Sequence, residues 1–193
     1  MSNIKLDKKN LAYVIGVALG DGGLSNPNGR AVRLRISCDT KYPAIIHNIT
    51  SAIKKFMPTN KVSKANRRAR CVDISCYSNK WEGILGWKAK GGSKEKQRVK
   101  IPDWIKNNKT YSKHCLRGLF ETDGSVYTDR SYKMANFVTI IPTLAKDVME
   151  IIAKLGFKPN IQKIKKENGK IKHTIRISKD TEKFIKLVKL NKS

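Results

Sequence analysis

Two short stretches, VALGDGGL (residues 17–24) and LFETDGSV (residues 119–126), each end an apolar run on Asp-Gly. The aspartates are Asp21 and Asp123, in a chain of 193 residues that has only 15 acidic side chains. If each apolar run is a helix, its carboxylate lies near the helix C-terminus, where the helix dipole disfavours negative charge by roughly 0.3–1 kcal/mol. The same unfavourable placement, made twice, indicates a shared purpose for the two acids.

The charge balance indicates a polyanionic partner. The chain has 41 Lys+Arg against 15 Asp+Glu, which gives a net charge of +26. Repulsion within such a chain destabilises the compact state unless a polyanion neutralises it. Nucleic acid is the polyanion favoured here, because contacts with its phosphates release counterions and so give a large electrostatic affinity. A lysine-rich solvated surface is the alternative, but such a surface usually has matching glutamates. The composition therefore favours nucleic-acid binding.

Several other classes of protein are not favoured. No run of 18 apolar residues is present, and the N-terminal MSNIKLDKKN lacks the apolar stretch of a signal peptide. The four cysteines form no C-x-x-C pair and the three histidines are scattered, so neither a zinc site nor a histidine-based nuclease motif is expected. We expect reduced thiols and an intracellular, reducing compartment, such as cytoplasm, nucleoid or an organelle matrix.

The segments that follow the two aspartates repeat in order and spacing. The order helix, strand, helix, strand, strand, helix is predicted twice. AVRLRISC (residues 31–38) alternates as a half-buried strand does, and SYKMANFVTI (residues 131–140) takes the same place in the second copy. A proline then opens a helix in each copy. We predict an α+β protein of two pseudo-symmetric halves, residues 1–100 and 101–193, with the basic segment 88–100 as a linker or arm.

Small residues one turn apart mark both apolar runs. The first run carries Gly16 and Gly20, and the second carries Gly118 and Thr122. Residues of this size let two helices approach closely. If the two helices pack about a pseudo-two-fold axis, the two aspartates converge, and a divalent cation between them reverses both the mutual repulsion and the dipole penalty. A single Asp-Gly is usually only a turn, so the argument depends on the repetition.

Converging carboxylates of this kind favour a hard ion over zinc, because their ligands are oxygens. Divalent ions at a scissile phosphate activate water and stabilise the leaving oxygen. A basic two-fold scaffold with a central pair of carboxylates is therefore interpreted as a nuclease.

The same residues resemble the signature of the LAGLIDADG homing endonucleases. LRGLFETDG and VIGVALGDG are the two matching stretches, and the matched residues are Leu116, Gly118, Leu119, Asp123 and Gly124 in one, and Gly16, Asp21 and Gly22 in the other. The resemblance implies two αββαββα-type halves, motif helices at the central interface, and a curved antiparallel sheet in each half that faces the DNA major groove. It also places one further strand directly after each Asp-Gly.

The resemblance implies a monomer that makes a metal-dependent double-strand break in a long asymmetric DNA site of roughly two helical turns, as in intron homing. Asp21 and Asp123 become the metal ligands, with the backbone carbonyls of Gly20 and Thr122 as additional candidates. The expected ion is Mg²⁺ or Mn²⁺, with Ca²⁺ as a non-cleaving substitute. A basic residue near the scissile phosphate is also expected, for which the first half offers Lys96 or Lys100, while Asp39 is a candidate for positioning water.

DNA contacts are expected on the open faces of the two sheets. Arginine commonly reads guanine, whereas lysine more often meets phosphate. The residues expected to contact DNA are Arg33, Arg35, Lys64, Arg67, Arg68, Arg70, Lys133, Lys163, Lys165, Lys172 and Arg176.

Two alternatives stay open. One is a catalytically impaired protein on the same scaffold, acting as an RNA maturase or a DNA-binding protein. Such relatives often lose one motif acid, and this chain keeps both, which favours cleavage. The other is a ribosome-associated basic protein whose Asp-Gly pairs are turns, which predicts neither metal dependence nor a two-fold relation between the halves.

Overall fold

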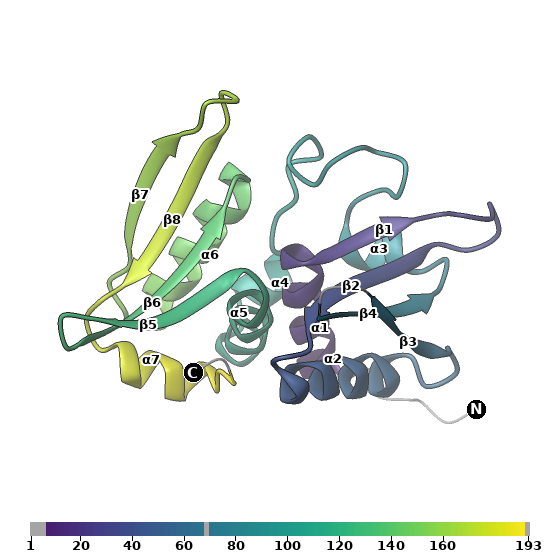
Figure 1. Cartoon of the computed structure of the whole chain (residues 1–193), viewed down its shortest axis with the longest axis horizontal. Coiled ribbons are helices and arrows are strands. Elements are labelled where there is room, and N and C mark those ends of the chain that lie inside the picture. Colours follow the sequence, from purple (N-terminus) through teal and green to yellow (C-terminus); the bar gives the residue numbers. More distant parts are fainter. Residues whose placement is uncertain (1–6, 68–69, 192–193) are drawn as a thin grey trace.

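The computed structural model describes residues 7–67 and 70–191. Two halves lie on either side of a central pair of helices, α1 (Lys8–Gly20) and α5 (Lys109–Asp123) (Figure 1). Asp7 caps the start of α1, and Asn108 caps the start of α5, because each side chain accepts backbone N–H groups of the first turn. None of the described helices is long and apolar enough to cross a bilayer.

Each half contains one four-stranded antiparallel sheet. Sheet A has the order β1-β2-β4-β3 and sheet B has the equivalent order β5-β6-β8-β7. The first half also has α2 and α3, and the second has α4, α6 and α7. The bounds are β1 (Gly22–Ser25), β2 (Arg33–Asp39), α2 (Pro43–Phe56), β3 (Val62–Arg67), β4 (Cys71–Tyr77), α3 (Trp81–Leu85), α4 (Asp103–Lys106), β5 (Gly124–Asp129), β6 (Tyr132–Thr139), α6 (Pro142–Lys154), β7 (Asn160–Lys165), β8 (Ile171–Ile177) and α7 (Thr181–Val188).

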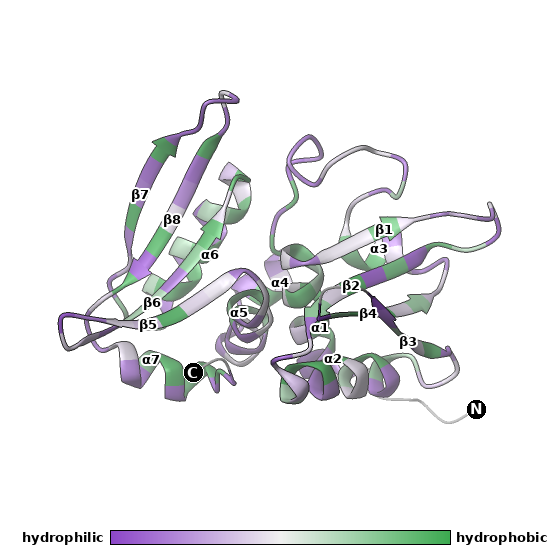
Figure 2. Cartoon of the chain, in the orientation of Figure 1, coloured by the Kyte–Doolittle hydropathy of each residue, from purple (hydrophilic) through white to green (hydrophobic). Residues whose placement is uncertain are grey.

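The predicted α+β fold with pseudo-symmetric halves is confirmed. The strands β1 and β5, which periodicity alone did not predict, lie where the family resemblance implied them, directly after each Asp-Gly. In β2, Leu34 and Ile36 are fully buried, whereas Arg35 is exposed on the opposite face. This alternation is visible along β2 as successive hydrophilic and hydrophobic bands (Figure 2). Each sheet therefore has one face against helices and one open face.

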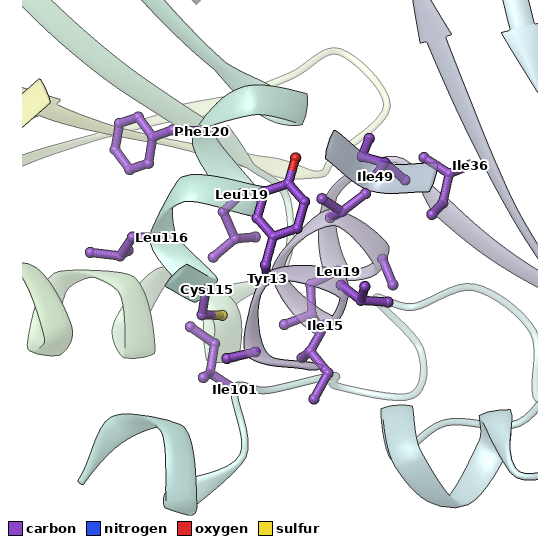
Figure 3. Close-up of a cluster of buried hydrophobic side chains, with 14 of the residues drawn as sticks. Tyr13, Ile15, Leu19, Ile36, Ile49, Ile101, Cys115, Leu116, Leu119 and Phe120 are labelled. Carbon is purple, nitrogen blue, oxygen red and sulfur yellow. The ribbon is translucent and has the colours of Figure 1, made fainter. Parts of the chain in front are cut away.

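The two central helices touch backbone to backbone. A Cβ atom added at Gly16 would lie 2.1 Å from the carbonyl oxygen of Cys115, and one added at Gly118 would lie 2.5 Å from the carbonyl oxygen of Tyr13. Buried side chains surround this contact, among them Leu19 and Leu119 (Figure 3). The predicted small-residue contact between the motif helices is thus present, and it lies at the centre of the hydrophobic core.

The basic segment 88–100 is packed rather than free. The Gln97 side chain accepts the backbone N–H of Lys88 at 2.7 Å and donates to its carbonyl at 3.0 Å. Val99 is buried, and the backbone N–H of Ile101 donates to the buried carboxylate of Asp147 at 2.7 Å. The segment therefore joins the halves through fixed contacts, and the division of the chain at residue 100 stays a prediction.

His173 on β8 is buried without a hydrogen-bond partner. Its residue is 5% exposed, and neither ring nitrogen is paired among the described residues. Register places it directly opposite Thr139 on β6 and Lys163 on β7. Burial lowers the pKa of His173, and the charge of Lys163 lowers it further.

Replacing Gly16 with alanine tests the helix contact. The added methyl group must displace the α5 backbone, so Gly16→Ala is expected to lower the free energy of unfolding by about 1–3 kcal/mol. Gly83→Ala in α3 is the control, since a Cβ there meets nothing within 4 Å. This substitution should leave the free energy of unfolding unchanged or raise it by less than about 1 kcal/mol. Urea unfolding measures both, and equal effects would contradict a backbone contact.

His173 predicts a sensitivity to acid. Because the pKa of His173 is lowered in the fold, the unfolded chain binds a proton at a pH where the folded chain does not. The free energy of unfolding is therefore unaffected above the ordinary histidine pKa and falls as the pH drops below it. His173→Phe should flatten the stability profile between about pH 8 and about pH 5, whereas the exposed His47→Phe should not. Thermal unfolding across this range gives the comparison, and identical profiles for the wild type and His173→Phe would refute it.

Candidate metal and DNA site

The C-terminal ends of the two motif helices converge. A Cβ atom added at Gly20 would lie 2.0 Å from the Thr122 hydroxyl oxygen and 3.3 Å from Oδ2 of Asp123. Asp21 directly follows α1, and Asp123 is the last residue of α5. The structure therefore brings both sequence-predicted acids to the same end of the helix pair, at the junction of the two halves.

Two cavities flank this junction. One, of about 510 Å³, is lined by Gly20 and Asp123 among others, and the second, of about 310 Å³, is lined by Asp21 and Thr122. Each cavity combines the aspartate of one helix with the residue that precedes the aspartate of the other helix. This crossed arrangement is what a two-fold axis between the helices produces.

A lysine from the connecting segment reaches the same place. The Nζ atom of Lys94 donates to the carbonyl oxygens of Ala18, at 3.2 Å, and Leu19, at 2.7 Å, and also to that of Gly20. Burial lowers the pKa of Lys94, whereas the nearby carboxylates of Asp123 and Asp21 raise it. A cation here offsets the negative end of the α1 dipole and part of the charge of the two acids.

Of the lysines in this segment, Lys94 reaches the end of the helix pair, whereas the candidate catalytic lysines Lys96 and Lys100 do not. Both of those side chains are exposed, and neither lines the two cavities. Lys94 is one of six basic residues between positions 88 and 100, and nothing in their spacing distinguishes it. Asp39, the candidate for positioning water, lines the smaller cavity together with Asp21.

Glu121 is a second residue that sequence reasoning missed. It is 3% exposed, accepts the hydroxyl of Tyr13 at 2.6 Å and pairs with Nε of Arg117 at 2.9 Å. Burial raises the pKa of Tyr13, and the Glu121 carboxylate raises it further. An acid inside the apolar run LFETDG was the available signal. Because Glu121 also lines the smaller cavity, it lies beside the site and links α5 to α1.

The donor set fits a hard divalent ion. Among the described residues, no group of three or more His, Cys, Asp and Glu side chains could hold a metal. Mg²⁺, however, keeps several waters and needs one or two carboxylates together with substrate phosphate oxygens. The carboxylates of Asp21 and Asp123 and the carbonyls of Gly20 and Thr122 are oxygen donors of this kind, although the Gly20 carbonyl accepts from the Lys94 ammonium in this structure.

The open face of each sheet carries part of the expected DNA-contacting set. In sheet A, strand alternation places these residues on the face opposite the buried Leu34 and Ile36; in sheet B, it places them opposite the buried Ile175 and Ile177. The residues on the open faces are Arg33, Arg35, Arg67, Lys172 and Arg176.

Four lysines of that set lie on the other face, so their expected placement on the open faces is wrong. Lys64 is opposite the buried Ile74, Lys163 is opposite the buried His173, and Lys133 and Lys165 share the helix-covered side of sheet B. Neighbouring residues in a strand project to opposite faces, so an error of one position reverses the assignment. Arg70 lies exposed in the turn after β3, and Arg68 falls outside the described residues.

Comparisons with known proteins agree with this geometry. A family model described as a LAGLIDADG-like domain matches residues 111–189, and one described as a WhiA LAGLIDADG-like domain matches residues 10–73. No curated protein sequence matches the chain.

Solved structures share the fold over nearly the whole chain. I-DmoI in complex with DNA and Mn has a TM-score of 0.69 at 18% identity, over 94% of this chain and 96% of that one. I-DmoI with DNA and Ca gives 0.66 at 18%, over 97% and 91%. The N-terminal LAGLIDADG domain of DUF199/WhiA gives 0.66 at 15%, over 95% and 84%.

Fold and site together define a duplicated α+β scaffold whose paired motif helices each end on an aspartate. Because the two family models match one half each, both motifs are accounted for in one chain. The chain belongs to the LAGLIDADG family, in its single-chain, two-motif form.

Removing the Lys94 ammonium tests its structural part in the site. Lys94→Met leaves the last carbonyls of α1 without their half-buried donor and should lower the free energy of unfolding by about 1–3 kcal/mol. Lys96→Met, two residues away and exposed, should change it by less than about 0.5 kcal/mol. Chemical unfolding of both variants measures the difference. An unchanged free energy of unfolding in Lys94→Met would contradict a structural role of Lys94 in the site.

Proposed function

We propose that the chain is a site-specific DNA endonuclease that makes a metal-dependent double-strand break by phosphodiester hydrolysis. The observation that carries this proposal is the convergence of Asp21 and Asp123 at one end of the helix pair, with a cavity on each side. Two strands of a duplex require two hydrolytic events, and the crossed cavities supply two equivalent places for them. The net charge of +26 supports DNA as the polyanion.

Each group has a role in this proposal. Asp21 and Asp123, with the carbonyls of Gly20 and Thr122, would hold Mg²⁺ or Mn²⁺. When bound, such an ion lowers the pKa of a water molecule and stabilises the leaving oxygen. Lys94 provides a fixed positive charge beside both acids, where it favours the approach of a phosphate group. Asp39 would orient water in the smaller cavity.

The open faces of sheets A and B would hold the DNA on either side of the helix pair. Arginines on sheet A and Lys172 with Arg176 on sheet B project to this side. A duplex that spans both sheets covers roughly two helical turns. The protein would bind it as a monomer, because the repeat within one chain supplies the two-fold symmetry that a dimer would otherwise provide. We also propose a reducing compartment, because all four cysteines are free thiols.

A second function is a sequence-specific DNA-binding protein that does not cleave. The observation that favours it is Lys94, since its ammonium group already gives the junction of the two acids a cation without any metal. The fold does not separate the two functions, because a likeness at 15% to 18% identity supports the architecture and not the activity.

The substitutions Asp21→Asn and Asp123→Asn separate the two functions. In the endonuclease, either change should abolish double-strand cleavage, because a ligand is lost, while DNA affinity should be unchanged or higher, since a negative charge is removed. The assay is incubation of a plasmid library carrying a randomised insert with Mn²⁺, followed by sequencing of the cut ends; EDTA gives the metal-free control.

Glu182→Gln is the matched control, because it removes the same charge at an exposed position on α7. It should cleave as the wild type does. Cleavage by the wild type that persists in both motif variants would refute the assigned role. Sequence-specific binding by the wild type without cleavage in any divalent ion would establish the second function instead.

A further inference from the structure

Besides Asp39, which ends β2 and lines the smaller cavity, a second acid lies on the open face of sheet A, where a DNA-binding protein has reason to avoid negative charge. Asp73 on β4 pairs in register with Ser37 on β2 and with Ala65 on β3. Alternation along β4 puts it on the face opposite Val72 and Ile74, which are buried in the core. An acid on this face reduces the attraction for phosphate, so its presence requires another explanation.

The Asp73 carboxylate is bound on both of its oxygens. The Ser37 hydroxyl donates to Oδ1 at 2.7 Å, and Nε of Arg67 donates to Oδ2 at 2.7 Å. Nη1 of Arg35 lies 4.0 Å from the same Oδ2. Burial raises the pKa of Asp73, but the hydrogen bonds from Ser37 and Arg67 and the nearby guanidinium charges outweigh burial and lower it, so the group is ionised at neutral pH.

The Asp73 side chain is buried, whereas the two arginine side chains beside it are exposed. The Asp73 side chain is 8% exposed, whereas those of Arg67 and Arg35 are 54% and 45% exposed. The carboxylate thus lies beneath two guanidinium groups that face solvent. Because Arg67 uses Nε for the ion pair, its two terminal nitrogens remain the donors for a bidentate pair, which is the geometry that reads O6 and N7 of guanine.

Sheet B lacks this arrangement at the equivalent register. Gly22 pairs with Ile36 in sheet A as Gly124 pairs with Phe137 in sheet B, so Thr174 corresponds to Asp73. By the same register, Val138 replaces Ser37, Asn136 replaces Arg35 and Ile164 replaces Arg67. On the open face of sheet A a carboxylate binds Arg67 and lies 4.0 Å from Arg35, whereas the open face of sheet B has neutral side chains in the same places.

We propose that Asp73 is a specificity-determining positioning residue of the DNA site. It fixes Arg67 and Arg35 so that they read guanine in the major groove of the half-site in front of sheet A. Fixing the guanidinium groups before binding reduces the side-chain entropy lost on recognition, which is how a negative charge on this face can improve discrimination. This inference rests on the proposed sequence-specific DNA binding, and holds for either function proposed above.

The test is selection of binding sites from a duplex library randomised over about 30 base pairs, roughly three helical turns, by the full chain in Ca²⁺. Asp73→Asn should reduce the preference for guanine at the positions in front of sheet A by about fivefold to a hundredfold. Affinity for random-sequence DNA should stay equal or rise, because a negative charge is lost. Preferences in the other half-site should not change, and Arg176→Lys identifies that half.

Two further variants separate positioning from folding and from charge. Arg67→Lys keeps the charge but loses the Nε bond and the bidentate donors, so guanine preference should fall while the salt dependence of binding stays the same. Asp129→Asn removes one negative charge at the end of β5 in the other half and should leave guanine preference unchanged.

The outcomes distinguish this inference from the proposed function. A wild-type chain that enriches no sequence overturns both. A wild-type chain that enriches a site without guanine in front of sheet A overturns the inference alone. The same is true if Asp73→Asn and Arg67→Lys keep the wild-type guanine preference, because the ion pair then serves only the fold and the arginines contact phosphate.

Discussion

The contact between the backbones of α1 and α5 is the constraint on which the structure depends. It requires glycine at Gly16 and Gly118, since a Cβ at either position overlaps the facing backbone. The close approach brings the two helix ends together, and with them the two acids. It also buries the apolar side chains around it, so the same contact builds the core and the site (Figure 3). A protein of this design cannot loosen its core without separating its carboxylates.

The acids at this junction are unfavourable by every local criterion. Each lies at a helix C-terminus, and the two are close enough to act on the same lysine. Lys94 offsets part of their negative charge. Carboxylate groups repel a phosphate group, in a chain that is otherwise strongly basic. A divalent ion changes the sign of the local charge, so binding of the ion and approach of the phosphate favour each other.

Much of the fold could be predicted because it is encoded in short periodic patterns. The small-residue strip, the alternation in 31–38 and the prolines at Pro43 and Pro142 are local signals, and the structure follows each of them. Lys94 and Glu121 could not be predicted in the same way. Lys94 reaches α1 from more than seventy positions away, so its role depends on the path of the connecting segment. The sequence does not distinguish it from the other lysines of that segment. The predicted face was wrong for four lysines because these strands alternate only weakly between apolar and polar residues, which does not determine which face of the sheet each residue occupies.

The duplicated fold keeps its symmetry in the backbone and loses it on the open faces of the two sheets. Strand order, the order of the motif helix, the proline-led helix and the closing helix, and the glycine that follows each aspartate are the same in both halves; α4 is an addition to the second half. The open faces differ, since sheet A presents arginines around a buried carboxylate and sheet B presents Asn136, Thr174 and Ile164 at the matching positions. The helix contact restricts the backbone and the buried side chains but places no restriction on the open faces. Under the proposed function, a symmetric scaffold can therefore recognise an asymmetric duplex, because the residues that fix the geometry and the residues proposed to read the bases lie on opposite sides of each sheet.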